Sequence, residues 1–309
     1  MSRQIPMLET PRPRLPSWFK VNFREGPDYQ EIRRLTGALK LHTICEEAHC
    51  PNVWECWNNR TATFLILGDI CTRRCHYCSV KTGRPLPLDE EEPARVAEAV
   101  KILGLRHAVI TSVNRDEVPD GGARMFAETI HAIRRELPTC TIEVLIPDFM
   151  GDERALDTVL AGKPDILNHN IETVPRLFPS VRPQGKYLRS IRLLHSASEK
   201  GAVTKSGLMV GLGETLGEVR AVMQELRETG CAILSIGQYL QPTKAHWPVI
   251  RFYEPSEFKW LKEESLALGF QHVESGPLVR SSYHAEEAVN TGSGRAGAIG
   301  GATAVRRSN

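Results

Sequence analysis

ATFLILGDICTRRCHYC, residues 62–78, joins a short apolar segment directly to three closely spaced cysteines. The first part, residues 62–68, is rich in β-favouring apolar side chains and predicts a buried strand. A CxxxCxxC motif follows it at Cys71, Cys75 and Cys78. The sequence therefore predicts a strand whose carboxyl end carries a tight loop of metal-binding side chains.

Segments typical of strands and segments with helical apolar spacing alternate in the chain that follows. Strands are predicted at residues 107–113, 141–146, 165–170, 204–210 and 233–238, and helices at residues 93–103, 123–137, 153–161, 186–200 and 215–229. Strands separated by helices pair in parallel through right-handed crossovers. An even series with no G-x-G-x-x-G turn after its first strand favours an α/β barrel, and about six units leave this (β/α)6 barrel incomplete.

The remaining chain is predicted to surround this partial barrel, which spans residues 60–241. Residues 1–59 form an N-terminal extension with further cysteines, and residues 242–285 form a C-terminal extension outside the alternation. The tail, residues 286–309, is rich in Gly, Ala and Ser, which cannot bury enough apolar surface to fold, and is expected to be disordered.

Polar clusters follow several predicted strands at their carboxyl ends, where barrel enzymes carry their chemistry. After CTRRCHYC they are NRDEVPDGG at residues 114–122, HNIET at residues 169–173 and GLGET at residues 211–215. The last is too short for a dinucleotide-binding fingerprint and is interpreted as a strand-to-helix loop.

Composition limits the partners and the compartment. Lys and Arg number 39 against 37 Asp and Glu, without a basic block, which gives no indication of binding to nucleic acid or to a membrane surface. No apolar run approaches the roughly twenty residues of a membrane-spanning helix, and the Pro-rich start lacks the apolar core of a secretory signal. We therefore expect a cytoplasmic protein, whose eight cysteines serve metal or redox chemistry. Cys140 and Cys231 stand alone among apolar neighbours and are expected in the core.

Three thiolates on one tight loop, at Cys71, Cys75 and Cys78, suit an iron-sulfur cluster. They can hold three irons of a 4Fe-4S cube and leave the fourth iron open for a ligand. The alternative is a zinc knuckle with His76 as the fourth ligand, although structural zinc sites usually pair CxxC units.

Cys45, Cys50 and Cys56 form a second triplet with CxxxxCxxxxxC spacing, which can also wrap a cluster. Such a cluster needs one more ligand from elsewhere. The alternatives are scattered core thiols or a second zinc site, because acidic residues and His49 lie in the same segment.

CxxxCxxC with an aromatic residue, Tyr77, before the third cysteine resembles the signature of the radical S-adenosylmethionine (SAM) superfamily. That resemblance implies that the open iron binds SAM, and that one electron cleaves SAM to methionine and a 5′-deoxyadenosyl radical. The resemblance narrows to the lipoyl synthase family in CEEAHCPNVWECWNNRTATFLILGDICTRRCHYCSVKTGRP, residues 45–85. It continues through ITSVNRDEVPDGGA, IEVLIPDFMGD, HNIETVPRLF, TKSGLMVGLGET, IGQYLQPT and SGPLVRSSYHA, and covers about residues 16–285.

The resemblance implies a second, auxiliary 4Fe-4S cluster on Cys45, Cys50 and Cys56. A serine of the family's RSSY motif completes its ligation, and the matching motif here is RSSY at residues 280–283. We assign the ligand to Ser282 over Ser281, and expect Arg280 and Ser282 to act in catalysis.

The implied reaction inserts two sulfur atoms at C6 and C8 of an octanoyl chain that is bound to a lysine of a lipoyl-carrier protein. Carriers in the family are the glycine cleavage H protein and the E2 subunits of 2-oxoacid dehydrogenases. Two SAM molecules are consumed, and the auxiliary cluster supplies the sulfur. The family also implies an electron donor such as ferredoxin or flavodoxin, and iron-sulfur assembly factors. Aliphatic C–H bonds are too strong for a general base, so a radical from a cofactor fits this task.

SAM contacts are expected at polar strand ends, from Asn114, Asp116, Asn170 and Glu172, together with Tyr77. For each loop residue a turn or a helix cap is an alternative role. The chain departs from the family pattern beside Asp116, where Glu and Val replace the more usual Asp and Leu, and within PQGKYLRSI.

Two other functions remain open at this point. One is a related sulfur-inserting enzyme, although biotin synthase lacks the N-terminal triplet and a methylthiotransferase carries an added RNA-binding domain. The other is an iron-sulfur carrier or electron-transfer protein, which would not need six βα units with polar loops at one rim.

Overall fold

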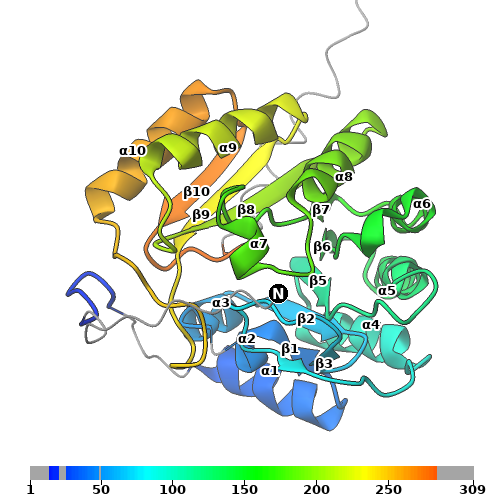
Figure 1. Ribbon diagram of the computed structural model, residues 1–309. Coiled ribbons are helices and arrows are strands. Elements are labelled where there is room, and N and C mark those ends of the chain that lie inside the picture. The colour runs from blue at the N-terminus through cyan, green and yellow to red at the C-terminus, as the bar shows by residue number, and fades with distance from the viewer. Residues whose placement is uncertain (1–13, 21–25, 49, 284–309) are drawn as a thin grey trace, which may run out of the picture.

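The computed structural model describes residues 14–20, 26–48 and 50–283, and its centre is one curved sheet (Figure 1). The strands follow the order β1-β2-β5-β6-β7-β8-β9-β10. They are β1 (His42–Thr43), β2 (Thr61–Ile66), β5 (His107–Ser112), β6 (Thr141–Leu145), β7 (Ile166–Asn168), β8 (Thr204–Val210), β9 (Ile233–Gln238) and β10 (His272–Gly276). All neighbours pair in parallel except β1, which is antiparallel to β2.

Helices surround the outside of the curved sheet (Figure 1). They are α4 (Glu92–Leu103), α5 (Ala123–Glu136), α6 (Glu153–Ala161), α8 (Tyr187–Glu199), α9 (Leu216–Glu228) and α10 (Pro255–Ala267). The N-terminal segment adds α1 (Pro27–Ala38), α2 (Ile44–Glu47) and α3 (Val53–Asn58). The prediction of an incomplete α/β barrel is confirmed, because consecutive parallel strands are joined by helices and the two edge strands, β1 and β10, do not pair.

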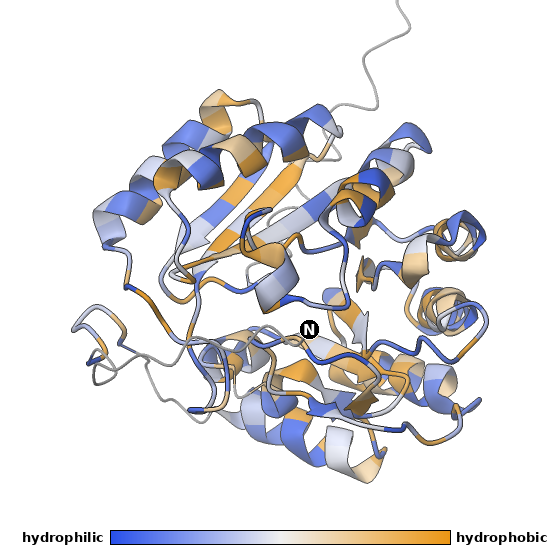
Figure 2. Ribbon diagram, in the orientation of Figure 1, coloured by the Kyte–Doolittle hydropathy of each residue, from blue (hydrophilic) through white to orange (hydrophobic). Residues whose placement is uncertain are grey.

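The burial pattern explains why these segments form these elements. All six residues of β2 and all six of β9 are buried, as expected for parallel strands covered on both faces. The helices present an apolar side to the sheet and a polar side to solvent, and Figure 2 shows this mixture of colours on α9 and α10. The start of α9 is fixed by a capping box between Thr215 and Glu218.

The expectation that the alternation ends before residue 242 is wrong. α10 and β10 follow β9, and β10 pairs in parallel with β9 from His272 opposite Ile233 to Gly276 opposite Gly237. They therefore add a seventh parallel strand to the six predicted. The division of the chain at residues 59, 241 and 285 stays a prediction, and the predicted disordered tail lies outside the described residues. Among the described residues, no helix is long and apolar enough to cross a membrane.

Segments from the two ends of the chain meet at the open side of the sheet. The side-chain amide of Asn52, next to α3, donates a hydrogen bond of 2.6 Å to the carbonyl of Leu278, beyond β10. The hydroxyl of Tyr283 donates to the carboxylate of Glu55 at 3.1 Å. These contacts bring the second cysteine segment beside the RSSY motif.

A buried ionic network lies inside the sheet, towards the amino ends of its strands. Glu143 is fully buried and accepts from Lys205 at 2.9 Å and from Asn168 at 2.8 Å, while His107 Nε2 lies 3.8 Å away. Burial alone would raise the pKa of Glu143, but the charge of Lys205 holds this pKa below its usual value. The ion pair between Glu143 and Lys205 and the hydrogen bond from Asn168 therefore join β6, β7 and β8.

Lys205→Met should lower the free energy of unfolding by about 3–5 kcal/mol, because it leaves the Glu143 charge buried without its partner. Adding Glu143→Gln should recover most of that loss, since the pair is then removed together. Urea unfolding followed by circular dichroism would measure both changes. A single variant as stable as the parent would contradict an ionised pair here.

Candidate cluster and cofactor site

The CxxxCxxC loop leaves the end of β2 and is held from three sides. It begins in the short strand β3 (Ile70–Cys71), which pairs with β4 (Lys81–Thr82). The ring of His76 donates to the carbonyl of Ser180 at 2.7 Å, within the short helix α7 (Phe178–Val181). From the segment after β9, His246 donates to the carbonyl of Cys78 at 3.0 Å, and the backbone N–H of Trp247 donates to the carbonyl of His76 at 2.8 Å. In this arrangement His76 anchors the loop through its ring.

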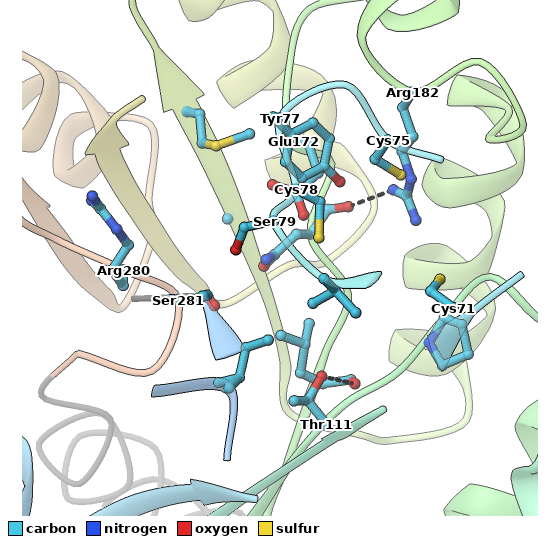
Figure 3. Close-up of a pocket in the computed structure, with 18 of the residues that line it drawn as sticks. Cys71, Cys75, Tyr77, Cys78, Ser79, Thr111, Glu172, Arg182, Arg280 and Ser281 are labelled. Carbon is cyan, nitrogen blue, oxygen red and sulfur yellow. Dashed lines mark hydrogen bonds between the residues drawn. The ribbon is translucent and has the colours of Figure 1, made fainter. Parts of the chain in front are cut away.

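A cavity of about 340 Å³ opens at the carboxyl ends of the barrel strands, beneath this loop. Figure 3 shows Cys71, Cys75 and Cys78 on one side of it and Arg280 and Ser281 on the opposite side. The polar lining also includes Tyr77, Asn114, His169, Asn170, Glu172 and Arg182. Four of the five residues expected to contact SAM therefore lie in one cavity with the three cysteines.

Several polar atoms in this cavity are buried and have no hydrogen-bond partner within the described part of the chain. They are Oδ1 of Asn114, Oδ1 of Asn170 and Nε of Arg182. Buried polar groups are normally paired, so this set fits a polar molecule that supplies both donors and acceptors. Burial raises the pKa of the Cys78 thiol to about 12, and that cost is offset when iron binds the thiolate. The lining therefore fits both a cluster and SAM.

Glu172 has a backbone conformation that L residues rarely adopt, with φ at 70°. Its N–H donates to the carbonyl of Gly207 and its carbonyl accepts from Met209, so β8 holds it in place. Burial raises the pKa of its carboxyl group, and the nearby charge of Arg182 opposes that rise. Such a conformation, held by its surroundings, is typical of functional sites.

Asp116 is not brought to this cavity. Its carboxylate forms two hydrogen bonds of 2.7 Å with the guanidinium of Arg73, which also pairs with buried Asp148 at 2.6 Å. Because Arg73 lies between two cysteines of the loop, this geometry makes Asp116 an anchor of the loop. It lines an adjacent cavity together with Glu117 and Met150.

The second triplet forms a separate site at the open side of the sheet. Cys45 on α2, Cys50, and Cys56 on α3 line one small cavity together with Ser282. Ser281 instead lines the main cavity. Burial raises the pKa of the Cys45 thiol to about 12, so this site also fits a positively charged metal group.

Among the residues that the structure describes, Arg280 is the one shared by the linings of the two cavities. Its guanidinium donates to the backbone carbonyls of Val279 at 2.7 Å and Gln238 at 3.3 Å. Burial raises the pKa of the Cys50 thiol, and the charge of Arg280 opposes that rise. A partly buried positive charge therefore lies where the two sites meet.

None of the eight cysteines, all of which are described, forms a disulfide, and Cys140 and Cys231 are buried in the core. Across the described ranges, no three His, Cys, Asp or Glu side chains converge on a single metal ion. No motif of the sequence indicated a role for Arg182. The available signal was its position on the same long loop after β7 as Asn170 and Glu172.

Comparison with known proteins agrees with this geometry. A model of the radical SAM superfamily matches residues 65–226, and a model of the N-terminal domain of lipoyl synthase matches residues 2–50. Methylornithine synthase has a similar structure, with a TM-score of 0.52 at 15% identity over 84% of this chain and 81% of that chain. SuiB from Streptococcus suis with bound SAM gives 0.56 at 10% identity over 75% and 57%. At these identities the structures show the radical SAM fold alone.

Curated relatives are much more similar in sequence. Lipoyl synthase of Rubrobacter xylanophilus is 61% identical over 287 residues, covering 92% of this chain and 89% of the relative. Lipoyl synthase of Roseiflexus sp. is 55% identical, covering 94% and 99%. The chain belongs to the lipoyl synthase family of the radical SAM superfamily. This membership implies the use of SAM and a 4Fe-4S cluster.

Gly237→Ala should detach the segment at residues 278–283 from β9. A Cβ atom at Gly237 would lie 2.1 Å from the carbonyl oxygen of Val279, which the backbone must move to avoid. Hydrogen exchange of this segment, read by mass spectrometry, should become faster. Gly217→Ala, whose Cβ would come no closer than 4.0 Å to Thr215, is the matched control and should leave that exchange unchanged. Equal exchange in both variants would mean that Gly237 does not position the motif.

Proposed function

We propose that this chain is a lipoyl synthase that inserts sulfur at C6 and C8 of an octanoyl chain carried on a lysine of another protein. The observation that carries the proposal is that two three-cysteine sites lie on opposite sides of Arg280, one of them within the main cavity. One site would hold the cluster that acts on SAM and the other the auxiliary cluster that supplies sulfur. Arg280 would therefore lie between the site of hydrogen abstraction and the source of sulfur.

In the main cavity, Cys71, Cys75 and Cys78 would hold the first 4Fe-4S cluster. When bound, this cluster and SAM supply a radical able to remove hydrogen from an unactivated carbon. The buried polar atoms of Asn114, Asn170 and Arg182 would orient SAM. Tyr77 and Glu172 line the same part of the cavity and would complete its polar wall.

The rest of the cavity suits an aliphatic chain. Its apolar lining includes Val113, Leu145, Ile146, Leu208, Leu240 and Val279. An octanoyl chain would bury its methylene groups against these side chains. Each methylene group contributes about 0.8 kcal/mol when it is removed from water. The same surface would exclude water from the reacting carbons.

At the second site, Cys45, Cys50, Cys56 and Ser282 would ligate the auxiliary cluster. Arg280 would stabilise its negatively charged thiolates, because the guanidinium lines the same cavity and its other hydrogen bonds are to backbone carbonyls. Ser282 would be the weaker ligand, since a hydroxyl oxygen is a harder donor than a thiolate. The cluster would therefore open on the side of Ser282.

The partners follow from this reaction and from the family. The substrates would be octanoylated lipoyl-carrier proteins, including the glycine cleavage H protein and E2 subunits of 2-oxoacid dehydrogenases. A ferredoxin or flavodoxin would supply electrons, and iron-sulfur assembly factors would load the sites. A cytoplasmic location suits the thiol state of the eight cysteines.

Two triple variants should separate the roles of the two sites. With Cys45, Cys50 and Cys56 changed to Ala, the reconstituted protein should still cleave SAM in the presence of dithionite but add no sulfur to an octanoyl-lysyl peptide. With Cys71, Cys75 and Cys78 changed to Ala, both activities should be lost. Anaerobic assays read by mass spectrometry would show the gain of two sulfur atoms by the parent. SAM cleavage without any sulfur gain by the parent would contradict the proposed reaction.

Ser282→Cys should block sulfur transfer while SAM cleavage continues, because a thiolate binds iron more firmly than a hydroxyl group does. Ser281→Cys is the matched control, since Ser281 lines the other cavity, and should leave the bound iron of the second site unchanged. Iron analysis and peptide mass spectrometry would report the two effects. Undiminished sulfur transfer by Ser282→Cys would remove Ser282 from its assigned role.

A further inference from the structure

Exposed cations border the cluster loop on several sides. Arg74 lies within the loop, and its backbone N–H donates to the side chain of Gln184 at 2.8 Å, two residues before Lys186. Arg84 directly follows Gly83, whose N–H donates to the carbonyl of Cys71. Lys244 lies two residues before His246, which binds the carbonyl of Cys78. These short links place all four cations beside the cluster loop.

These cations differ from the acidic groups of the same rim in their pairing. All four are exposed, and none forms an ion pair with a described residue. The nearby carboxylates are already engaged, by a cation or by backbone N–H groups: Asp69 with Lys81, Asp116 with Arg73, Glu117 with Arg115, and Glu214 with the N–H groups of Gly211 and Leu212. The carboxylates around the cluster loop therefore do not neutralise these four cations.

Two of the most exposed apolar side chains of the described residues accompany these cations. Leu86 is 75% exposed and lies two residues after Arg84. Leu188 is 63% exposed and lies two residues after Lys186. Isolated exposed leucines need no explanation, but exposed leucines close to unpaired cations suit a protein interface.

We infer that Arg74, Arg84, Lys186 and Lys244, with Leu86 and Leu188, form a docking surface, the basic rim, for a folded carrier domain with an acidic surface. This inference rests on the proposed function, because the carrier must bring its octanoyl-lysine to the main cavity, which the cluster loop beside the basic rim helps to line. The lysine arm enters the cavity while the acidic surface around it pairs with the rim. The rim thus recognises the carrier, and the cavity recognises the octanoyl chain.

The test compares one reaction on two substrates. The substrates are an octanoylated carrier domain of net negative charge and a short octanoyl-lysyl peptide without net charge. Arg84, Lys186 and Lys244 are changed together to Glu, and Arg74 is kept because its backbone anchors the cluster loop. The matched control changes Arg34, Arg106 and Lys163 to Glu, which alters the net charge equally, away from the cluster loop.

The rim variant should lose on the order of tenfold or more in kcat/KM for the carrier domain, with less than about twofold change for the peptide. Direct titration should show that salt weakens carrier binding to the parent and to the control variant, and much less to the rim variant. Carrier kinetics equal to those of the control would overturn the docking surface, and so would an equal loss on both substrates. If the parent protein adds no sulfur to either the carrier domain or the peptide, the proposed function itself is contradicted.

Discussion

An incomplete barrel has two sheet edges that cannot hydrogen-bond to each other, and the rest of this structure depends on how that opening is closed. β1 and β10 are the edges. The gap between them is bridged by side-chain contacts from segments near the two ends of the chain, including the bond between Asn52 and Leu278. An unpaired edge strand exposes backbone N–H and C=O groups that can pair with another chain and cause aggregation. Covering the edges therefore protects the protein from aggregation. The same covering segments bring three cysteines beside Ser282, which makes the second site a product of closure.

The regular elements were predictable because their signals are local. Buried strands and amphipathic helices each carry their burial pattern within one segment, and most observed boundaries fall within one or two residues of those predicted. α10 and β10 were not predicted as a further helix and strand of the barrel. The strand reads HVESG, with one fully buried apolar residue, Val273, so its sequence lacks the continuous apolar run of β2 or β9. An edge strand needs fewer apolar residues, because one of its sides has no strand beside it.

The residues of the site were predictable to the extent that they occur in compact motifs. Each three-cysteine group could be found from spacing, and Asn170 and Glu172 from their position after a strand. The role of Asp116 was harder to predict, because its partner Arg73 is 43 residues away in sequence and only the folded loop brings the two side chains together. Arg182 lacks a motif altogether, and its importance follows from burial beside the cysteines. Neighbouring serines in RSSY are indistinguishable by composition, yet alternate side-chain directions send them to different cavities.

The closure of the barrel also sets an order in time. Asn52 and Leu278 are 226 residues apart in sequence, so a ribosome needs on the order of ten seconds or more to make the chain between them. Until then the thiols of Cys45, Cys50 and Cys56 exist without Ser282, which lines the same cavity. A nascent chain therefore cannot complete the second cavity. A group that binds there can do so only after Ser282 has been synthesised. The residues that line the second cavity therefore meet only after most of the chain has been made, and a group that they hold would bind after that step.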